Sequence, residues 1–319
     1  MRTGVGELRE RAGRLRARLV RCDLCPRDCQ VNRLAGERGY CGVAADLPVA
    51  AALAHFGEEP PISGTRGAGT IFFGGCNLRC DYCQNIQISR LLIPVASRGA
   101  GSVADEMLRL EREGCHNIEW VTPSHLIPQI LEAVALAAEQ GLAVPIVYNT
   151  GGYDRVEILR ELDGVVDVYL PDLKYGHAEA GGRLSGASDY WEIARHAVHE
   201  MVRQAGELQV DAAGCAQRGV IVRHLVLPGD LAGSGEVLRF IASLDPRPPL
   251  ALMAQFSPIP QCGHPGLARP LSEAEYDRVR RQVEDLGLEG WIQDLSSAAT
   301  FRPDFSRADP FSATGPAPR

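Results

Sequence analysis

Ten cysteines are distributed unevenly along the chain, and their grouping constrains it more than any other feature. Four lie between positions 22 and 41, three lie between 76 and 83, and three stand alone at 115, 215 and 262. Closely spaced cysteines in a chain without a secretory signal are more often metal ligands than disulfide partners. The N-terminal segment is rich in arginine and has no apolar stretch, so it does not match a signal peptide. We therefore interpret both groups as metal sites and expect a cytoplasmic protein.

The central group has the spacing C-x3-C-x2-C and consists of Cys76, Cys80 and Cys83, directly after a predicted strand. Glycines before Cys76 allow the loop to turn around a cuboidal cluster, and thiolates are the ligands that iron–sulfur clusters require. Three protein ligands leave one of four irons open, and reactive metal sites keep such an open position. The alternatives are three buried cysteines, or a zinc site with a distant fourth ligand.

The N-terminal group consists of Cys22, Cys25, Cys29 and Cys41. Four thiolates within twenty residues can close a tetrahedral site with no vacancy. Such a closed site indicates either a structural zinc ion or an iron–sulfur cluster that relays electrons. The spacing is compatible with both kinds of metal site. Paired disulfides or free thiols are the remaining alternative.

After Gly74, short apolar runs alternate with amphipathic helical stretches, a pattern typical of a parallel sheet with crossover helices. Six such units can close most of a barrel. We therefore predict an α/β fold with a partial (βα)6 TIM-type barrel over 61–300. A helix and the four-cysteine metal module precede it over 1–60, and an irregular tail follows over 301–319. The predicted strands are Thr70–Phe73, Asn117–Val121, Val144–Tyr148, Val166–Leu170, Val220–Val226 and Leu250–Gln255. The predicted helices are Val103–Arg112, Leu126–Gln140, Asp154–Leu162, Asp189–Gln204, Gly235–Ser243 and Ser272–Leu286.

Charge and hydropathy exclude two classes of partner. The chain of 319 residues has 33 basic and 40 acidic side chains, so its net charge is −7. An acidic chain is a poor candidate for binding nucleic acid through phosphate contacts. The sequence contains no run of eighteen apolar residues, so we also expect no membrane span.

The segment GGCNLRCDYC on the first strand of an α/β repeat resembles the radical S-adenosylmethionine (SAM) superfamily. The resemblance implies an oxidoreductase with a 4Fe–4S cluster whose open iron binds SAM. It also implies that an electron from the cluster cleaves SAM to a 5′-deoxyadenosyl radical, which abstracts hydrogen. Tyr82 occupies the superfamily's aromatic position near the adenine. Many members carry Gly-Gly-Glu-Pro after the second strand, and this motif holds the SAM amine. This chain has Thr122-Pro123-Ser124-His125 at that place. The SAM amine would therefore be bound by backbone groups such as those of Thr122.

Strand ends further along resemble pyruvate formate-lyase activating enzyme. Asn149, Thr150 and Gly151 follow the third strand, and Asp172 and Lys174 follow the fourth. The resemblance implies that these residues lie near the carboxylate and ribose of SAM. His224, at the fifth strand, is assigned either a SAM contact or a buried core position.

The segments CDLCPRDC, WVTPSH, YNTGGY and RHLVLPGD extend the resemblance to the PflX-type branch of these activating proteins, from about position 22 to 257. It implies an activase that installs a glycyl radical on a partner enzyme, with reduced flavodoxin or ferredoxin as electron donor. The alternatives are a radical SAM enzyme that modifies a small molecule or peptide, and a non-catalytic metal-binding or electron-transfer protein. An activase needs an open cavity that admits a loop of its partner, whereas a small-molecule enzyme needs a covered one.

Overall fold

The computed structural model describes residues 2–297 and 303–312. Its centre is an eight-stranded sheet in the order β3-β1-β2-β4-β5-β6-β8-β7, beside a three-stranded sheet in the order β11-β10-β9. The larger sheet contains β1 (Leu47–His55), β2 (Ala68–Phe73), β3 (Ser97–Arg98), β4 (Ile118–Val121), β5 (Ile146–Thr150), β6 (Val168–Pro171), β7 (Gln209–Val210) and β8 (Ala216–Val220). The smaller contains β9 (Val222–Leu225), β10 (Leu250–Met253) and β11 (Gly290–Ile292).

Pairing from β2 through β4, β5 and β6 to β8 is parallel, and so is pairing from β9 through β10 to β11. The two sheets meet beyond β6, where Asp172 forms a parallel bridge with Arg223. The Leu173 N–H also donates to the Arg223 carbonyl at 2.8 Å. The expected α/β fold with a mostly parallel sheet is therefore confirmed, and each of the six predicted strands overlaps an observed one.

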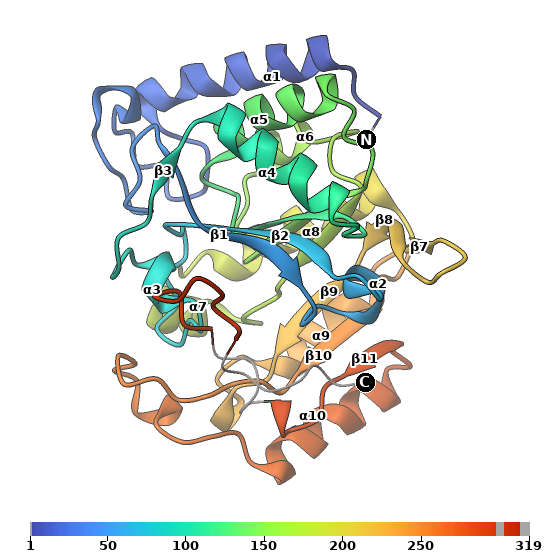
Figure 1. Cartoon of the computed structure of the whole chain (residues 1–319). Helices are drawn as coiled ribbons and strands as arrows, with labels where there is room; N and C mark the ends of the chain where they lie inside the picture. The colour runs from blue at the N-terminus through green and yellow to red at the C-terminus, as the bar shows by residue number, and fades with distance from the viewer. Residues whose placement is uncertain (1, 298–302, 313–319) are drawn as a thin grey trace.

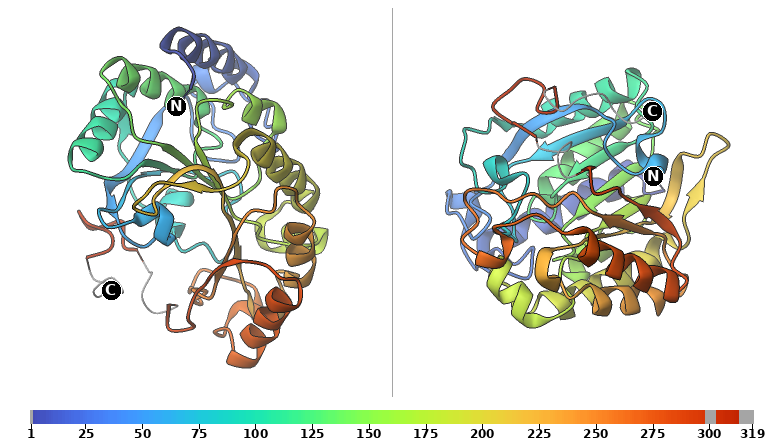
Figure 2. Two further views of the ribbon diagram at one scale, coloured as in Figure 1. Left: turned by 90° about the vertical axis from the view of Figure 1, so that its right-hand side faces the viewer. Right: turned by 90° about the horizontal axis from the view of Figure 1, so that it is seen from below.

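Helices cover the sheets from outside, as Figures 1 and 2 show. They are α1 (Val5–Ala17), α2 (Pro60–Ser63), α3 (Ile86–Ser89), α4 (Ala100–Arg112), α5 (Ile127–Glu139), α6 (Val156–Arg160), α7 (Ala178–Ser185), α8 (Tyr190–Ala205), α9 (Ser234–Ala242) and α10 (Glu273–Asp285). Helix α10 begins with the capping box that its sequence predicts, because Ser272 and Glu275 each accept from the other's backbone N–H. None of the helices within the described residues is long and apolar enough to cross a membrane.

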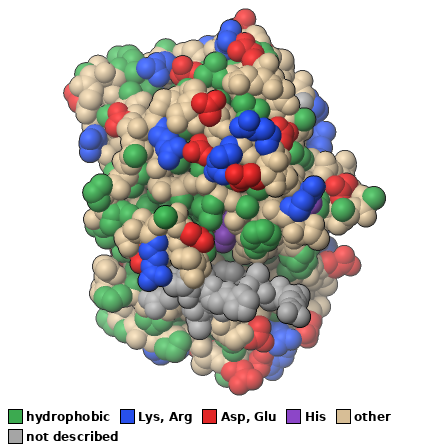
Figure 3. All heavy atoms as spheres, in the orientation of Figure 1, with side chains coloured by type: hydrophobic (Ala, Val, Ile, Leu, Met, Phe, Trp, Pro, Cys, Tyr) green, Lys and Arg blue, Asp and Glu red, His purple; other side chains and the backbone are tan. Residues whose placement is uncertain are grey.

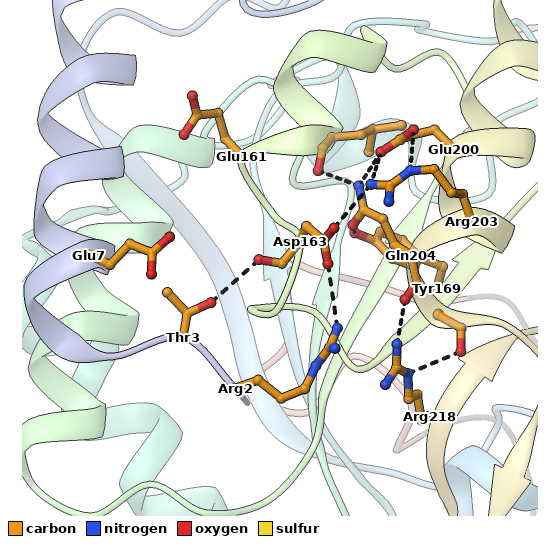
Figure 4. A network of polar contacts seen from close by, with 12 residues as sticks. Arg2, Thr3, Glu7, Glu161, Asp163, Tyr169, Glu200, Arg203, Gln204 and Arg218 are labelled. Atoms are coloured by element: carbon orange, nitrogen blue, oxygen red, sulfur yellow. Dashed lines mark hydrogen bonds and ion pairs between the residues drawn. The ribbon is translucent and has the colours of Figure 1, made fainter.

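Helix α5 is apolar on nearly every face because it is covered on both sides. One face lies on the sheet, and α1 packs along the outer face (Figure 1). The buried residues Leu8, Ala12 and Leu15 form the contact stripe of α1. Arg2 and Thr3 then fix the start of this helix to Asp163, which also pairs with Arg203 on α8 (Figure 4).

Strand β1 is absent from the sequence-based prediction, although it forms the longest strand described. Its sequence, LPVAAALAH, is rich in alanine and poor in β-branched residues, so its strand propensity is low. It forms because β2 offers an antiparallel partner, with pairs from Val49–Phe73 to His55–Ala68. This strand carries the chain from the N-terminal cysteines to the edge of the parallel sheet.

Candidate active site

A cavity of about 420 Å³ lies at the carboxyl ends of β2, β4, β5, β6, β9 and β10. Ligands of open α/β sheets bind at this edge, because the loops after the strands converge there. Three thiols, from Cys76, Cys80 and Cys83, line it together, and all three cysteines are free of disulfides. The central cysteine group therefore faces this cavity.

The loop after β2 wraps around the Cys76 sulfur. The backbone N–H groups of Leu78 and Arg79 point at this sulfur at 3.3 and 3.5 Å. Ser89 on α3 donates to the Cys83 sulfur at 3.4 Å. Burial, together with the neighbouring cysteines, raises the pKa of the Cys76 thiol to about 12. Soft metal ions displace such thiol protons, so the donor set fits an iron–sulfur cluster.

All but one of the residues expected to contact SAM line this same cavity. They are Tyr82, Thr122, Asn149, Thr150, Gly151, Asp172 and Lys174. Thr122 has a φ of 59°, a costly conformation for a β-branched residue, and its N–H donates to the Asn149 carbonyl at 2.9 Å. This strained turn directs the backbone after β4 towards the cavity.

Asp172 and Lys174 form an ion pair inside the cavity, with Lys174 Nζ 2.6 Å from Asp172 Oδ2. Burial opposes the charge on Lys174, but Asp172 and Cys80 outweigh it and raise the pKa of the lysine. The Tyr190 hydroxyl fixes the backbone on both sides of the pair, because it donates to the Asp172 carbonyl and accepts from the Lys174 N–H, both at 2.8 Å. Asp172 Oδ1 is buried without a hydrogen-bond partner among the described residues. A ligand donor would satisfy this oxygen.

His224 does not line the cavity, so its assignment as a SAM contact is corrected. Its ring is fully buried, with Nδ1 2.6 Å from the Leu173 carbonyl and Nε2 2.8 Å from the Ser234 hydroxyl. Successive side chains of a strand point to opposite faces, and it is the preceding residue, Arg223, that reaches the cavity. The histidine is a satisfied core residue.

Arg223 pairs with two carboxylates that the sequence did not reveal. Its Nε donates to Glu59 at 2.7 Å, and its Nη2 contacts both Glu59 and Glu58. All three side chains line the cavity and are about nine-tenths buried. Burial opposes the charge on Arg223, but the two carboxylates outweigh it and raise its pKa. The part of the cavity wall around Arg223, which bridges to Asp172, therefore carries two acids against one base.

A second missed carboxylate, Glu119 on β4, lies in the interior of the sheet. Its two oxygens accept from Thr70 at 2.8 Å and from Asn149 at 2.7 Å. Burial, together with the nearby Glu58, raises the pKa of Glu119 to about 8. Because Asn149 lines the cavity, Glu119 fixes the orientation of a cavity side chain. A single glutamate in an apolar strand gives no sequence pattern by which it could be found.

The four N-terminal cysteines lie together in a loop that follows α1 and contains only short 3₁₀ turns. Burial, together with the nearby Cys41, Cys22 and Cys29, raises the pKa of Cys25 to about 12. The Tyr40 N–H points at the Cys29 sulfur at 3.3 Å. Within the described residues, no three His, Cys, Asp or Glu side chains are arranged to hold a metal ion. The second metal site thus stays a prediction.

The N-terminal cysteine loop packs directly against the loop of the central cysteines. A side chain at Gly75, whose φ is 81°, would approach the Cys41 carbonyl to 2.6 Å. Arg27 donates to the Asn77 carbonyl and to the Ser185 carbonyl, both at 2.7 Å, and lies over the Tyr40 ring at 3.8 Å. The two cysteine groups, about fifty residues apart in sequence, share one interface.

Residues 303–312, here named the C-terminal strap, lie against the cavity. Pro303 and Phe311 line it, and the Phe311 ring lies 4.2 Å from the His55 ring. Phe305 is buried against Phe72, with ring centroids 5.3 Å apart. Gln87, next to the central cysteine loop, accepts from the Phe305 N–H at 2.8 Å. The part of the predicted tail at 301–302 and 313–319 lies outside the described residues.

The fold and the site define a class of protein. It is an α/β protein whose three-thiol loop and adjoining polar cavity can hold a metal cluster beside an organic ligand. The model of the radical SAM superfamily matches residues 70–239, which is more than half of the chain. This protein belongs to the radical SAM superfamily, and membership implies a 4Fe–4S cluster, SAM and cleavage of SAM to a radical.

Similar proteins include two from Methanocaldococcus jannaschii. The uncharacterized protein MJ0674 is 29% identical over 275 residues, which cover 84% of this chain and 75% of that protein. The uncharacterized protein MJ0808 is 27% identical over 176 residues, half of each chain. A radical SAM methyltransferase from Sphaerobacter thermophilus aligns with a TM-score of 0.47 and 15% identity, over 70% of this chain and 66% of that structure.

Proposed function

We propose that this protein is an enzyme that cleaves SAM reductively and uses the 5′-deoxyadenosyl radical to abstract hydrogen from an unactivated carbon. Cys76, Cys80 and Cys83 hold the cluster and leave one iron for SAM. When bound, the cluster supplies the electron that splits SAM into methionine and the radical. The observation that supports this best is the joint lining of one cavity by these three thiols and the Asp172–Lys174 pair.

The cavity residues have distinct roles in this proposal. Lys174 binds the SAM carboxylate, and the free Oδ1 of Asp172 accepts a hydrogen bond from the SAM amine or ribose. Tyr82 packs against the adenine, while the turns at Thr122 and at 149–151 enclose the ligand. The strands from β2 to β10 form one open, partial barrel in this interpretation, with the ligands at its carboxyl end.

The N-terminal cysteines hold a second metal in this proposal, either zinc or an iron–sulfur cluster. Support comes from the four thiols in one buried loop and from the contact of that loop with the central cysteine loop. Reduced flavodoxin or ferredoxin supplies electrons.

Two substrate classes remain. The resemblance to activating enzymes favours a glycine loop of a partner enzyme. The C-terminal strap favours a small molecule or short peptide, because its aromatic side chains cover part of the cavity. Incubation of the reduced protein and SAM with a candidate glycyl-radical enzyme distinguishes the two substrate classes. Only an activase produces a glycyl radical on that enzyme, and electron paramagnetic resonance detects this radical.

The experiment that tests the proposed function is anaerobic reconstitution with iron and sulfide, followed by dithionite, SAM and assay of 5′-deoxyadenosine. The wild-type protein should produce it, and Cys80→Ala should lose this product together with most of the cluster absorbance. Cys115→Ala is the matched control, because Cys115 is buried but does not line the cavity. Product from Cys80→Ala at the wild-type rate would refute the assignment.

A further inference from the structure

A second hollow lies on the outer side of the central cysteine loop. It has a volume of about 290 Å³. In Figure 1 the N-terminal loops that border it lie on the same side of the molecule as α3 and α7. The residues that line it come from three segments: Tyr40, Arg79, Asp81, Arg90 and the end of α7 with Arg183, Leu184, Ser185 and Gly186.

The central cysteine loop alone separates this hollow from the cavity. Arg79 and Asp81 line the outer hollow, whereas Cys80 between them lines the cavity. Consecutive Cα atoms are about 3.8 Å apart, so the surface of the hollow lies one residue from a proposed cluster ligand. An electron that arrives there reaches the central cysteines by a short path through the loop.

The same hollow borders the N-terminal cysteines through Tyr40. The Tyr40 N–H contacts the Cys29 sulfur, and its hydroxyl donates to the Leu78 carbonyl in the central loop at 3.2 Å. Tyr40 also precedes Cys41 in the chain. One residue therefore contacts both cysteine loops, the first through its backbone N–H and the second through its hydroxyl, and it lines the hollow.

The hollow is basic. Three of its charged residues are arginines and one is Asp81, which Arg90 holds at 2.7 Å. Arg79 forms no salt bridge within the described residues, and its Nε is buried there without a hydrogen-bond partner. On the face that Figure 3 shows, in contrast, basic and acidic side chains are interspersed.

The N-terminal segment, which contributes Tyr40 to the hollow, is basic in sequence, although Arg9 and Arg14 on α1 pair with acids of other segments. Residues 1–44 contain ten arginines and five acidic residues, a net charge of +5, whereas the whole chain has a net charge of −7. The remainder of the chain therefore has a net charge of −12. A basic patch on an acidic protein selects an acidic partner and orients it, because the rest of the surface repels that partner.

We infer that this hollow is the docking site of a small acidic electron-transfer protein. The partner places its redox group over Tyr40, Arg79 and Arg183, and one electron passes from that group through the cysteine loop to the central cluster. The donor is oxidised by one electron, the cluster is reduced by one, and no covalent bond changes. The inference rests on the proposed function, since it assigns the entry point of the electron that SAM cleavage consumes.

Charge reversal at Arg183 tests the inference. Arg183 is 64% exposed and pairs only with Glu179, one turn away, within the described residues. The control is Arg239→Glu on α9, because Arg239 is 60% exposed, pairs with Glu236 and does not line the hollow. The probe is flavodoxin, used oxidised for calorimetric binding and photoreduced for stopped-flow reduction of the reconstituted cluster.

At low ionic strength, Arg183→Glu should weaken flavodoxin binding about tenfold, equivalent to about 1.4 kcal/mol, and should slow cluster reduction by flavodoxin to a similar degree. The effect should shrink as salt is added. Dithionite needs no docking surface and should reduce both variants and the wild type alike. Arg183→Gln should give an intermediate loss and guards against misfolding of the reversal variant.

Equal binding of flavodoxin by the Arg183→Glu and Arg239→Glu variants would overturn the docking site. That result is distinct from failure of the proposed function. If dithionite-reduced wild-type protein formed no 5′-deoxyadenosine, the enzymatic proposal would fail, whatever the binding data showed.

Discussion

Charged side chains at the cavity are held by partners from distant parts of the chain. Arg223 lies 164 positions from Glu59, and the two side chains meet only because β9 and the segment after β1 face the same hollow. The central cysteines, in contrast, were predictable because their spacing is local. Pairs such as Asp172 and Lys174, two positions apart, are predictable for the same reason. A residue whose partner is far away in sequence leaves no local pattern.

Replacement of Arg223 by methionine should destabilise the protein strongly. The change leaves Glu58 and Glu59 buried without a cation, and breaking one side of a buried ion pair costs about 3–5 kcal/mol. Urea denaturation measures this loss. Arg239→Met is the control, because Arg239 and its partner Glu236 are 60% and 56% exposed, and surface pairs contribute about 1 kcal/mol or less. Similar losses for both variants would contradict the account of the buried network.

Glu119 should make stability depend on pH. Burial raises its pKa from 4.5 to about 8, so the folded protein retains a proton that the unfolded chain releases between these values. Its contribution to stability is therefore complete below about pH 4.5 and is lost as the pH rises to about 8. Glu119→Gln removes this titration. The stability advantage of the wild type over the variant should fall across that range, and a constant difference would show that Glu119 is already ionised.

Helices and strands that lie far apart in the sequence position the site by packing against one another. Helix α1 on α5 and strand β1 on β2 bring the N-terminal loop to the edge of the parallel sheet. Short apolar runs predicted β2, β4, β5, β6, β9 and β10, because these strands are buried along nearly their whole length. The alanine-rich β1 escaped prediction because its pairing with β2, rather than its own propensity, makes it a strand.

Removal of an N-terminal cysteine should distinguish the contributions of the two metal sites. Cys25→Ser is expected to lower the total metal content by one site, because Cys25 is buried among the other three cysteines. The central cluster should keep its absorbance, and some SAM cleavage should remain. Elemental analysis for iron and zinc identifies the metal that is lost. Cys215→Ser, at a single buried cysteine, is the control, and an unchanged metal content in Cys25→Ser would remove the second site from the account.

At the scale of the whole molecule, the protein places a covered cavity on one side of a single loop and a basic hollow on the other. The loop that carries the central cysteines is therefore the boundary between the proposed chemistry and the proposed electron supply. The N-terminal segment, the parallel sheet and the C-terminal strap all contact this loop or its neighbours. The α/β class and the grouping of the central cysteines could be predicted from sequence, whereas this arrangement of two hollows depends on tertiary packing.

Mössbauer spectroscopy of the reconstituted, iron-57-labelled protein, with and without SAM, tests the central claim most directly. Three cysteines leave one of the four irons without a protein ligand. SAM should therefore change the isomer shift of one iron in four, and the isomer shifts of the other three irons should stay the same. A spectrum that SAM leaves unaltered would mean that the cluster is closed, and a central site that binds zinc alone would contradict the account altogether.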